Sequence, residues 1–471
     1  MQPTARSRAW IAAAFGLALA CVGCEAPPEE RPSSVVMVVV DTLRADRFGA
    51  RRDGESLTPF LDALAESSTV FHNAYSTSPW TSPAVASLFT SRYPSQHGVH
   101  DFGSVLPGDE ETLAEILAAR GVEAGGFSSN PLVGRSRGFE QGFGFFRAVG
   151  ADAGGPAART ERAIDAARRA IRWVDDRATP TAQPFFLYLH VMDPHSPYAP
   201  DRHARARVFG DGPQPDPDAV NEAMRHHLTE EIPEPTRRAV VGLYDAEVSS
   251  TDAALEHFFS ALTERGRLDD AVVVVTADHG EELWDHGMFG HHHSLHAEVL
   301  RVPLLVRLPG QSARRDVREA VSLLDVAPTL LELLGLDVPA HFEGRSLAPC
   351  LEGAPDTCGA VDRIVAGELL LPPKLRRTPH ERTVVVGDKQ LIRDFDGVEH
   401  VVDLARADAA DEGDEADASG IAPEESRVLR DHIDRLIARV TDPDAPRQGA
   451  RERVELDEAA RDELRALGYL E

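Results

Sequence analysis

Three segments of the chain are continuous apolar runs that end in acidic or imidazole side chains. They are SSVVMVVVDTLRAD (33–46), PFFLYLHVMDPHSPY (184–198) and DDAVVVVTADHGEE (269–282). An unbroken run of valine, leucine and phenylalanine is typical of a parallel strand that is buried on both faces. We therefore expect three buried strands, each with polar residues at its carboxyl end.

Helical periodicity lies between these runs, with apolar residues recurring every three or four positions. It is clearest in residues 58–67, 111–121, 161–176 and 243–266. Strands that alternate with helices predict an α/β fold. We expect a three-layer α/β/α sandwich around a large, mostly parallel mixed sheet.

The pattern changes after about residue 345. Residues 382–404 alternate between apolar and polar, with turn signals at Gly387 and Asp396-Gly397, which predicts antiparallel strands. We expect a catalytic domain over 35–345 and a small C-terminal α+β subdomain with a short antiparallel sheet over 346–471. Residues 201–237 are expected to leave the sheet, and the acidic tract 405–420 is expected to be solvated.

The N-terminus has the features of an export signal. Arg6 and Arg8 precede an apolar run from Trp10 to Val22, which is too short for an ordinary membrane-spanning helix. The run ends in CVGC, which resembles a bacterial lipobox with Cys24 as the lipidated residue. We expect a signal peptide over 1–23, a tether over 24–34, and a lipoprotein in the periplasm or cell envelope. A plain cleaved signal peptide is the alternative.

The net charge of −28 argues against nucleic acid or an anionic membrane surface as a partner. An anionic substrate would then need local positive charge, and metal ions are an economical source. Beyond Cys21 and Cys24, the chain has only Cys350 and Cys358. In an exported protein this pair is expected to form a local disulfide, and a metal site or two free thiols are the alternatives.

The polar residues at the strand ends have the side chains that bind Zn²⁺ or Mn²⁺. Asp41 ends the first strand, Asp193 and His195 follow the second, and Asp278-His279 follow the third. Ligands of open parallel sheets gather at the carboxyl ends of strands, so we expect one shared site. Further histidines follow the third strand, namely His286, His291, His292, His293 and His296.

Thr81 opens a turn, PWTSPAVASLFT, that has the features of a catalytic turn entering a helix. Pro83 suits a first helical turn, so Thr81 is expected at the N-terminus of that helix, where an anion is favoured. A hydroxyl is a poor nucleophile at neutral pH, but a metal lowers the pKa of an oxygen ligand by many units. The alternative is that Thr81 or Ser82 only caps the helix, which is compatible with a catalytic role.

The motifs quoted above, together with RVPLLVRLPG (301–310) and the closing ELRALGYL, resemble the sulfatase family of the alkaline phosphatase superfamily. The resemblance runs from about Val35 to the C-terminus. It implies that Asp41, Asp278 and His279 hold a metal. It also places Thr81 where sulfatases carry the Cys or Ser that is oxidised to formylglycine.

The resemblance implies roles for four further residues. His195 would face the leaving group or help to bind a second metal. His291 falls where many relatives carry a lysine that binds the substrate anion, and with Asp193 and His195 it could form a second metal site instead. Asn130 is a candidate hydrogen-bond donor to the oxygens of the substrate.

Several positions depart from the family pattern. Val85 stands where the sulfatase motif has an arginine, and Thr42 stands where it has a second aspartate. The only lysines of the chain, Lys374 and Lys389, lie outside the motifs. Threonine cannot become formylglycine, whose hydrate releases sulfate by elimination. A threonine ester must instead be opened by water, as two-metal members of the superfamily do at phosphorus.

We therefore predict a metal-dependent hydrolase of a small anionic ester that uses a threonine nucleophile, with a P–O bond favoured over an S–O bond. One or two Zn or Mn ions are expected, whereas Ca would accompany a true sulfatase. The alternatives are a true arylsulfatase-like enzyme, a phosphoethanolamine or glycerol-phosphate transferase, and a non-catalytic envelope lipoprotein on the same fold. Contact with a membrane is expected only through the lipid anchor.

Overall fold

The computed structural model describes residues 32–149, 161–177, 183–210, 212–225, 231–353, 358, 363–371, 381–407, 421–440, 453–454 and 458–466. The predicted signal peptide, Cys24 and most of the acidic tract lie outside these residues, as does Lys374. Among the described residues, no helix combines the length and the apolar character that crossing a bilayer requires.

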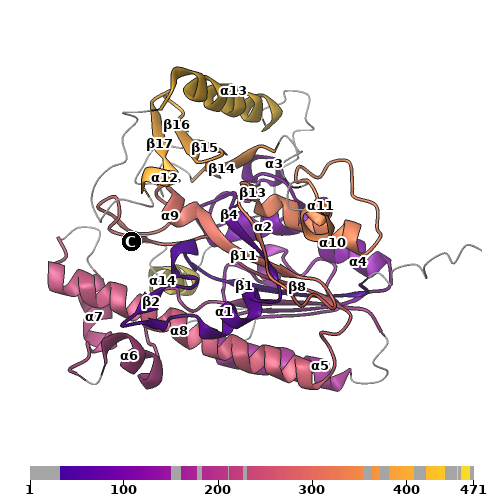
Figure 1. Ribbon diagram of the computed structural model, residues 1–471, viewed down its shortest axis with the longest axis horizontal. Coiled ribbons are helices and arrows are strands. Elements are labelled where there is room, and N and C mark those ends of the chain that lie inside the picture. Colours follow the sequence, from indigo (N-terminus) through magenta and orange to yellow (C-terminus); the bar gives the residue numbers. More distant parts are fainter. Residues whose placement is uncertain are drawn as a thin grey trace, which may run out of the picture. The chain divides into compact units, whose positions relative to one another are not determined.

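The central sheet has nine strands among the described residues, in the order β12-β4-β11-β8-β1-β7-β5-β6, with β13 also paired to β4 (Figure 1). β11 runs antiparallel to both of its neighbours, and the other pairings in the sheet are parallel. The predicted mostly parallel mixed sheet is thus confirmed. The strands are β1 (Ser34–Val40), β4 (Thr69–Tyr75), β5 (Glu123–Ser128), β6 (Phe145–Ala148), β7 (Phe185–Val191), β8 (Ala271–Ala277), β11 (Arg301–Arg307), β12 (Arg315–Val317) and β13 (Val321–Ser322).

The three apolar runs form the centre of this sheet. β1 lies between β7 and β8 and is parallel to both, and all three are buried along their whole length. Their β-branched side chains suit the pleated surface, and burial on both faces explains the lack of apolar-polar alternation. Because the three strands are parallel and in register, their polar carboxyl ends meet at one edge.

Helices cover both faces of the sheet, which confirms the three-layer architecture (Figure 1). One layer holds α1, α5 and α8, and the other holds α2, α4 and α10. The helices are α1 (Pro59–Ala65), α2 (Thr81–Thr90), α3 (Pro94–His97), α4 (Leu113–Ala119), α5 (Ala163–Asp176), α6 (Arg202–Phe209), α7 (Pro217–Met224), α8 (Glu234–Glu264), α9 (Ala297–Leu300), α10 (Val326–Leu333), α11 (Ala348–Glu352), α12 (Leu404–Ala407), α13 (Pro423–Val440) and α14 (Glu458–Ala466).

Short elements complete the chain. They are the hairpins β2 (Arg51–Arg52) with β3 (Glu55–Ser56) and β9 (Glu282–Leu283) with β10 (Phe289–Gly290), and the 3-10 turns η1 (Ala45–Arg47), η2 (Arg135–Arg137) and η4 (Leu323–Asp325). The described residues of the segment 201–237 lie outside the sheet, as predicted, and include α6, α7 and the start of α8. The histidine-rich segment begins at His286 in the hairpin β9–β10 and continues between β10 and α9.

The C-terminal part forms a second, antiparallel sheet, as predicted. Its strands are β14 (Val365–Leu369), β15 (Glu381–Val386), β16 (Lys389–Asp394) and β17 (Glu399–Asp403), paired in chain order. The apolar side of α13 packs on it through Leu429, Ile433 and Leu436. The expected disulfide joins Cys350 to Cys358.

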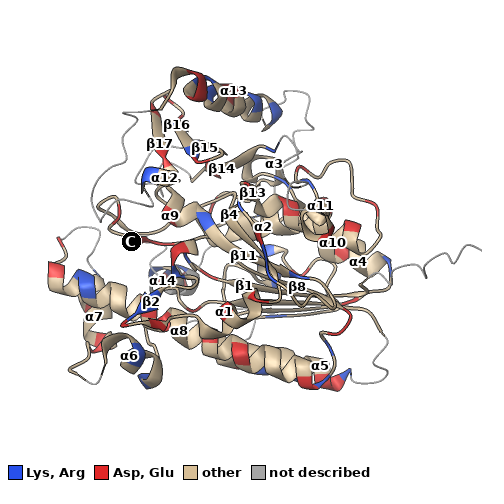
Figure 2. Ribbon diagram, in the orientation of Figure 1, with Lys and Arg blue, Asp and Glu red and all other residues tan. Residues whose placement is uncertain are grey.

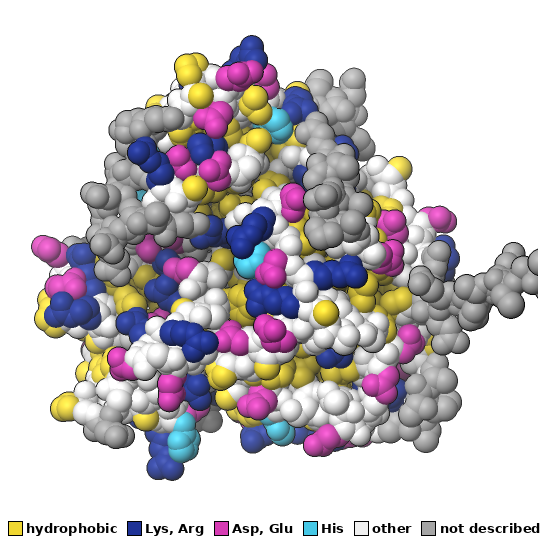
Figure 3. All heavy atoms as spheres, viewed as in Figure 1, with side chains coloured by type: hydrophobic (Ala, Val, Ile, Leu, Met, Phe, Trp, Pro, Cys, Tyr) yellow, Lys and Arg dark blue, Asp and Glu magenta, His cyan; other side chains and the backbone are white. Residues whose placement is uncertain are grey.

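Charged residues are spread over many elements. Figure 2 shows acidic and basic residues mixed along α13 and α5. On the face shown in Figure 3, basic and acidic side chains are interspersed over the described surface. The acidic excess of the chain is therefore not gathered into one patch on that face.

Candidate active site

The candidate site lies at the carboxyl ends of the three central strands. Asp41 directly follows β1 and Asp278 directly follows β8, while His190 is the penultimate residue of β7. All three side chains are fully buried. The His190 Nε2 atom lies 3.6 Å from Oδ2 of Asp41 and 3.8 Å from Oδ2 of Asp278. The predicted convergence of strand ends thus brings two carboxylates and one imidazole together.

His190 is a site residue that the sequence analysis missed. It stands inside an apolar strand, where a single histidine is more often a packing residue than a ligand. Its Nδ1 shares a hydrogen bond of 3.2 Å with the Tyr188 hydroxyl, so its other nitrogen faces the two carboxylates. The available signal was its place one residue before the end of β7, whose neighbour β1 is followed directly by Asp41.

His279 also turns a ring nitrogen toward the carboxylates. Its Nδ1 donates to the carbonyl oxygen of Gly280 at 2.8 Å. Nε2 therefore carries the lone pair and lies 3.7 Å from Oδ1 of Asp41 and 3.5 Å from Oδ2 of Asp278. This is the orientation of a metal-binding histidine, whose second nitrogen is held by an acceptor outside the site.

Thr81 is the first residue of α2 and is fully buried, as the turn motif predicted for a helix N-terminus. The N-cap is Trp80, and no side chain caps this helix. The Thr81 hydroxyl instead donates to Nε2 of His279 at 3.3 Å and accepts from Nδ2 of Asn130 at 3.2 Å. The capping alternative therefore does not describe what this side chain does.

Asn130 bridges the hydroxyl and the first aspartate. Its amide nitrogen donates to Oδ2 of Asp41 as well as to Thr81, and its carbonyl oxygen accepts from the backbone of Leu132 at 2.7 Å. The predicted role as a donor to substrate oxygens stays a prediction. The structure adds that Asn130 fixes the separation between Thr81 and Asp41.

His291 is the member of the 291–293 run that faces the site. Its ring centroid lies 4.6 Å from that of His279 and 5.0 Å from that of His195. Its Nδ1 donates to Oε1 of the buried Glu281 at 2.8 Å. The next glutamate also contacts a histidine of this run, since Nε2 of His293 lies 2.5 Å from Oε2 of Glu282.

The remaining histidines have other surroundings. His292 has a left-handed backbone, with φ of 61°, and its ring meets the edge of Phe102. His286 and His296 stack on each other with centroids 3.7 Å apart. The Nδ1 atom of His195 donates to the carbonyl oxygen of Ser196. Burial lowers the pKa of His195, and burial together with the neighbouring His279 imidazole lowers that of His291 well below its ordinary value, so both rings are neutral near pH 7.

The carboxylates create a demand for positive charge. Burial raises the pKa of Asp278, and the nearby charge of Asp41 raises it further. Burial also acts to raise the pKa of Asp41, but the neighbouring imidazoles of His190, His195 and His279 outweigh it, so that pKa is lowered. Two buried carboxylates this close do not both ionise readily without a cation between them.

The residues present fit a divalent cation. Oδ1 of Asp41, Oδ2 of Asp278 and Nε2 of His190 are buried and have no hydrogen-bond partner within the described chain. One ligand atom from each of these residues lies within 4.8 Å of the other two. Buried polar atoms without partners are costly, and a shared metal ion would satisfy all three at once.

Asp193 lies in a different environment from the other predicted ligands. Its Oδ2 accepts from the backbone N–H of Ala163 at 2.7 Å, in the first turn of α5, and lies 3.8 Å from Nε of Arg162. It is not part of the group formed by Asp41, His190 and Asp278. A second metal bound by Asp193, His195 and His291 stays a prediction.

The departures from the family pattern also have structural consequences. Thr42 adopts a left-handed backbone, with φ of 54°, and contacts Asp278 through its N–H at 3.3 Å. Lys389 lies in β16 of the second sheet, where its ammonium group forms an ion pair with Asp388 at 2.8 Å.

A family model for sulfatases matches residues 33–336. The chain is 26% identical to the arylsulfatase K of Xenopus laevis over 363 residues, which cover 69% of this chain and 68% of that protein. It is 31% identical to the multifunctional alkaline phosphatase superfamily protein PehA of Trinickia caryophylli, but that match covers 37% of this chain and 38% of the relative.

Solved structures share the fold. A structure in complex with its substrate, D-glucosamine-2-N,6-O-disulfate, aligns with a TM-score of 0.70 at 18% identity and covers 89% of this chain and all of that one. The phosphonate monoester hydrolase of Agrobacterium radiobacter aligns with a TM-score of 0.67 at 20% identity and covers 87% of this chain and 95% of that one. At these identities the likeness concerns the fold alone.

Proposed function

Because the chain belongs to the sulfatase family, whose members hydrolyse sulfuric and phosphoric esters, we propose that it is a metal-dependent hydrolase that uses Thr81 as its nucleophile and favours P–O bonds. The observation that carries this proposal is the position of the Thr81 hydroxyl. It is held between His279 and Asn130, next to the buried carboxylate of Asp41. An unmodified threonine at this point is placed to form a covalent ester.

The metal would be held by Asp41, Asp278, His190 and His279, with Thr81 adjacent. Bound there, it would neutralise the carboxylates and act as a Lewis acid that lowers the pKa of an oxygen ligand. Two imidazoles beside two carboxylates suit Zn or Mn. Calcium prefers six to eight oxygen ligands, so this donor set disfavours it. We propose one such ion at this centre. A second ion, bound by Asp193, His195 and His291, stays a prediction.

The proposed reaction has two displacements. In the first, Oγ1 of Thr81 bonds to phosphorus and loses its proton, while the bond to the leaving oxygen breaks and that oxygen takes up a proton. Asn130 and the N-terminal N–H groups of α2 offer donors to the charged oxygens. In the second, water attacks phosphorus and breaks its bond to Oγ1, which restores the threonine hydroxyl and releases the phosphorus-containing acid.

His195 and His291 are placed to move these protons. Both are buried and neutral near pH 7, so either ring can accept a proton from water in the second displacement. Because Nδ1 of each ring is held by Ser196 or Glu281, Nε2 is the nitrogen that would exchange the proton. This assignment is part of the proposal.

A true sulfatase is the second candidate, and the relative that favours it is the arylsulfatase K of Xenopus laevis. A threonine in the nucleophile position argues against it, because elimination from a formylglycine hydrate is not open to threonine. A transferase and a non-catalytic lipoprotein remain the further alternatives. The retention of Asp41, Asp278 and His279 around Thr81 disfavours the non-catalytic alternative.

A substrate panel tests the proposed function. Purified protein would be assayed with Zn or Mn on an aryl phosphate, a bis-aryl phosphate, an aryl phosphonate monoester and an aryl sulfate that share one leaving group. The proposal expects kcat/KM to be highest on a phosphorus ester. A higher value on aryl sulfate would establish the sulfatase alternative, and product transfer to an added alcohol in preference to water would establish the transferase.

We also propose that the chain is exported and anchored through lipidated Cys24, a residue outside the described part of the structure. The disulfide between Cys350 and Cys358 supports an oxidising compartment. Mass spectrometry of the mature N-terminus tests this proposal. A diacylated Cys24 would support it, and an N-terminus at an unmodified neighbouring residue would contradict it.

A further inference from the structure

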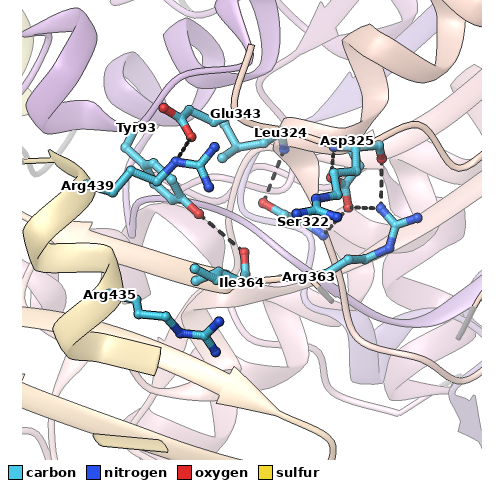
Figure 4. Close-up of a pocket in the computed structure, with 11 residues that line it drawn as sticks. Tyr93, Ser322, Leu324, Asp325, Glu343, Arg363, Ile364, Arg435 and Arg439 are labelled. Carbon is cyan, nitrogen blue, oxygen red and sulfur yellow. Dashed lines mark hydrogen bonds and ion pairs between the residues drawn. The ribbon is translucent and has the colours of Figure 1, made fainter. Parts of the chain in front are cut away.

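A cavity of about 190 Å³ (Figure 4) lies near the C-terminal end of α2, the end opposite Thr81. Tyr93, which lines it, follows the last residue of α2 by three positions, whereas Thr81 is the first residue. A ten-residue helix is about 15 Å long, so the cavity is separate from the candidate active site. Figure 4 shows side chains from the segment after α2, from η4 and from α13 around it.

Arginine dominates the charge of this cavity. Four arginines and two carboxylates line it, in a chain whose net charge is −28. The carboxylates are already engaged, because Asp325 pairs with Arg363 at 3.0 Å and Glu343 pairs with Arg439 (Figure 4). The cavity therefore carries more positive than negative charge.

Arg363 has an unsatisfied donor. Its side chain is only 7% exposed, and its two terminal nitrogens donate to the carbonyl oxygens of Arg345 and Ser346 at 2.7 and 3.0 Å. Its Nε is buried and has no hydrogen-bond partner within the described chain. An unsatisfied donor on a buried guanidinium is costly, so an acceptor in the cavity would be stabilising.

Arg345 also lines the cavity and supplies an accessible cation. Its backbone N–H donates to Oδ1 of Asp325 at 2.6 Å, which fixes the segment, while its side chain is exposed. Within the described residues, the structure shows no acidic partner for the Arg345 guanidinium. The planar, always charged guanidinium matches the oxygens of sulfate and phosphate.

From these contacts we infer that the cavity binds an oxyanion of the sulfate or phosphate class, with Arg345 and Arg363 as its main contacts. The ligand is either the free inorganic ion or the charged group of a monoester. This site is independent of the proposed hydrolysis, because none of its residues belongs to the candidate active site.

Calorimetric titration of the full-length protein tests the inference. Metal would first be removed with a chelator, because the active-site carboxylates repel anions when no cation is bound. Sodium sulfate and sodium phosphate would then be titrated at constant ionic strength into wild-type protein, Arg345→Glu and the matched control Arg120→Glu. Arg120 is also exposed, and it lies after α4, outside the cavity lining.

The expected result is one saturable site per chain in the wild type and in Arg120→Glu, with affinity at least tenfold weaker in Arg345→Glu. Since Arg345 is exposed, this variant is expected to melt like the wild type, whereas Arg363→Gln would leave Asp325 buried without its ion pair. Methyl phosphate and methyl sulfate distinguish the two ligand sources. If the monoesters bind as tightly as the inorganic ions, the ligand is the charged group of an ester. If they bind at least tenfold more weakly, the ligand is the free ion.

The inference is overturned if the wild type shows no saturable binding of either ion, or if Arg345→Glu binds both ions as tightly as the wild type does. Neither result bears on the proposed hydrolase, whose substrate panel is measured at a different site. Anomalous scattering from selenate soaked into crystals would give the position of the ion directly.

Discussion

Nε2 of His190 lies 3.6 Å from Oδ2 of Asp41, across the neighbouring strands β7 and β1. The register pairs His190 with Val39, so the imidazole lies beside the carboxyl end of β1. At the position where the family pattern has a second aspartate, this chain has Thr42. Nε2 of His190, on the adjacent strand β7, thus adds a nitrogen donor to a centre whose other donors are the carboxylates and His279.

The first prediction concerns this imidazole. His190→Ala is expected to weaken binding of Zn or Mn at least tenfold, because it removes a buried donor that faces both carboxylates. Metal content after dialysis and competition with a chelator would measure the effect. His257→Ala, an exposed histidine on α8, is the control. Unchanged metal affinity in His190→Ala would remove this residue from the proposed centre.

The second prediction concerns the nucleophile. Thr81→Ala is expected to lower kcat by about a thousandfold or more, because no neighbouring hydroxyl can replace the attacking oxygen. Thr81→Ser retains that oxygen and is expected to keep substantial activity. Ser82→Ala is the matched control, since the Ser82 hydroxyl donates to the carbonyl of Leu132 at 3.3 Å, away from Thr81. Full activity in Thr81→Ala would refute the proposed mechanism.

The third prediction concerns the orientation of His291. Glu281→Ala is expected to lower kcat by about tenfold to a hundredfold, the size of effect seen when the partner of a functional histidine is removed. Burial raises the pKa of Glu281 well above its ordinary value, so glutamine is a close substitute. Glu281→Gln should therefore stay within a few-fold of wild type. Nitrogen NMR of the His291 tautomer separates a positioning role from general destabilisation, because only a positioning role predicts a changed tautomer in Glu281→Ala.

The fourth prediction concerns Gly280, which follows the Asp278-His279 pair. A Cβ built at this position would lie 2.0 Å from the carbonyl oxygen of Glu298, so alanine must push the backbone apart. We expect Gly280→Ala to cost about 1–3 kcal/mol of unfolding free energy and to lower activity. At Gly144 the nearest atom would be 3.7 Å away, so Gly144→Ala is the control. Equal unfolding midpoints in the two variants would contradict the prediction.

The fifth prediction concerns pH and the buried Asp252. Its two oxygens each accept a backbone N–H, from Phe60 and Leu61 at 2.9 Å, but burial raises its pKa to about 7. The ordinary value in an unfolded chain is about 3.9. Between these values the native state holds the proton more tightly, so this contribution to stability falls as pH rises and is lost above about pH 7.

Asp252→Asn cannot titrate and should lack that slope. As pH rises from 4 to 8, the unfolding free energy of the wild type is expected to fall relative to that of Asp252→Asn. The change in this difference is at most about 4 kcal/mol, at about 1.4 kcal/mol per unit of pKa shift. Urea denaturation of both proteins at several pH values would measure this difference. A difference that is constant with pH would show that the Asp252 pKa is ordinary.

Much of the fold could be predicted from sequence because the signals are local. The apolar runs of β1, β7 and β8 are long and unbroken, and parallel strands must place their carboxyl ends at one edge. That rule alone brings Asp41 and Asp278 together. The position of Thr81 at the start of α2 followed equally from Pro83, since proline suits the first helical turn.

The orientation of single side chains could not be predicted in this way. Asp193 lies two residues after β7, much as Asp41 follows β1, but its carboxylate contacts the first turn of α5 instead of the cluster around Asp41. His190 is part of that cluster although it looks like an ordinary core residue. Strand order and rotamer decide between such residues, and both depend on contacts between segments far apart in the chain.

The sequence by itself determined the family, the α/β architecture and the set of polar strand ends, because these depend on periodicity and on short motifs. Only the tertiary structure decided which donors share one centre, which of the three consecutive histidines faces it, and that an arginine-lined cavity lies at the far end of α2. Those features join residues that are separated by up to hundreds of positions. Their positions depend on packing in three dimensions, which no local pattern records.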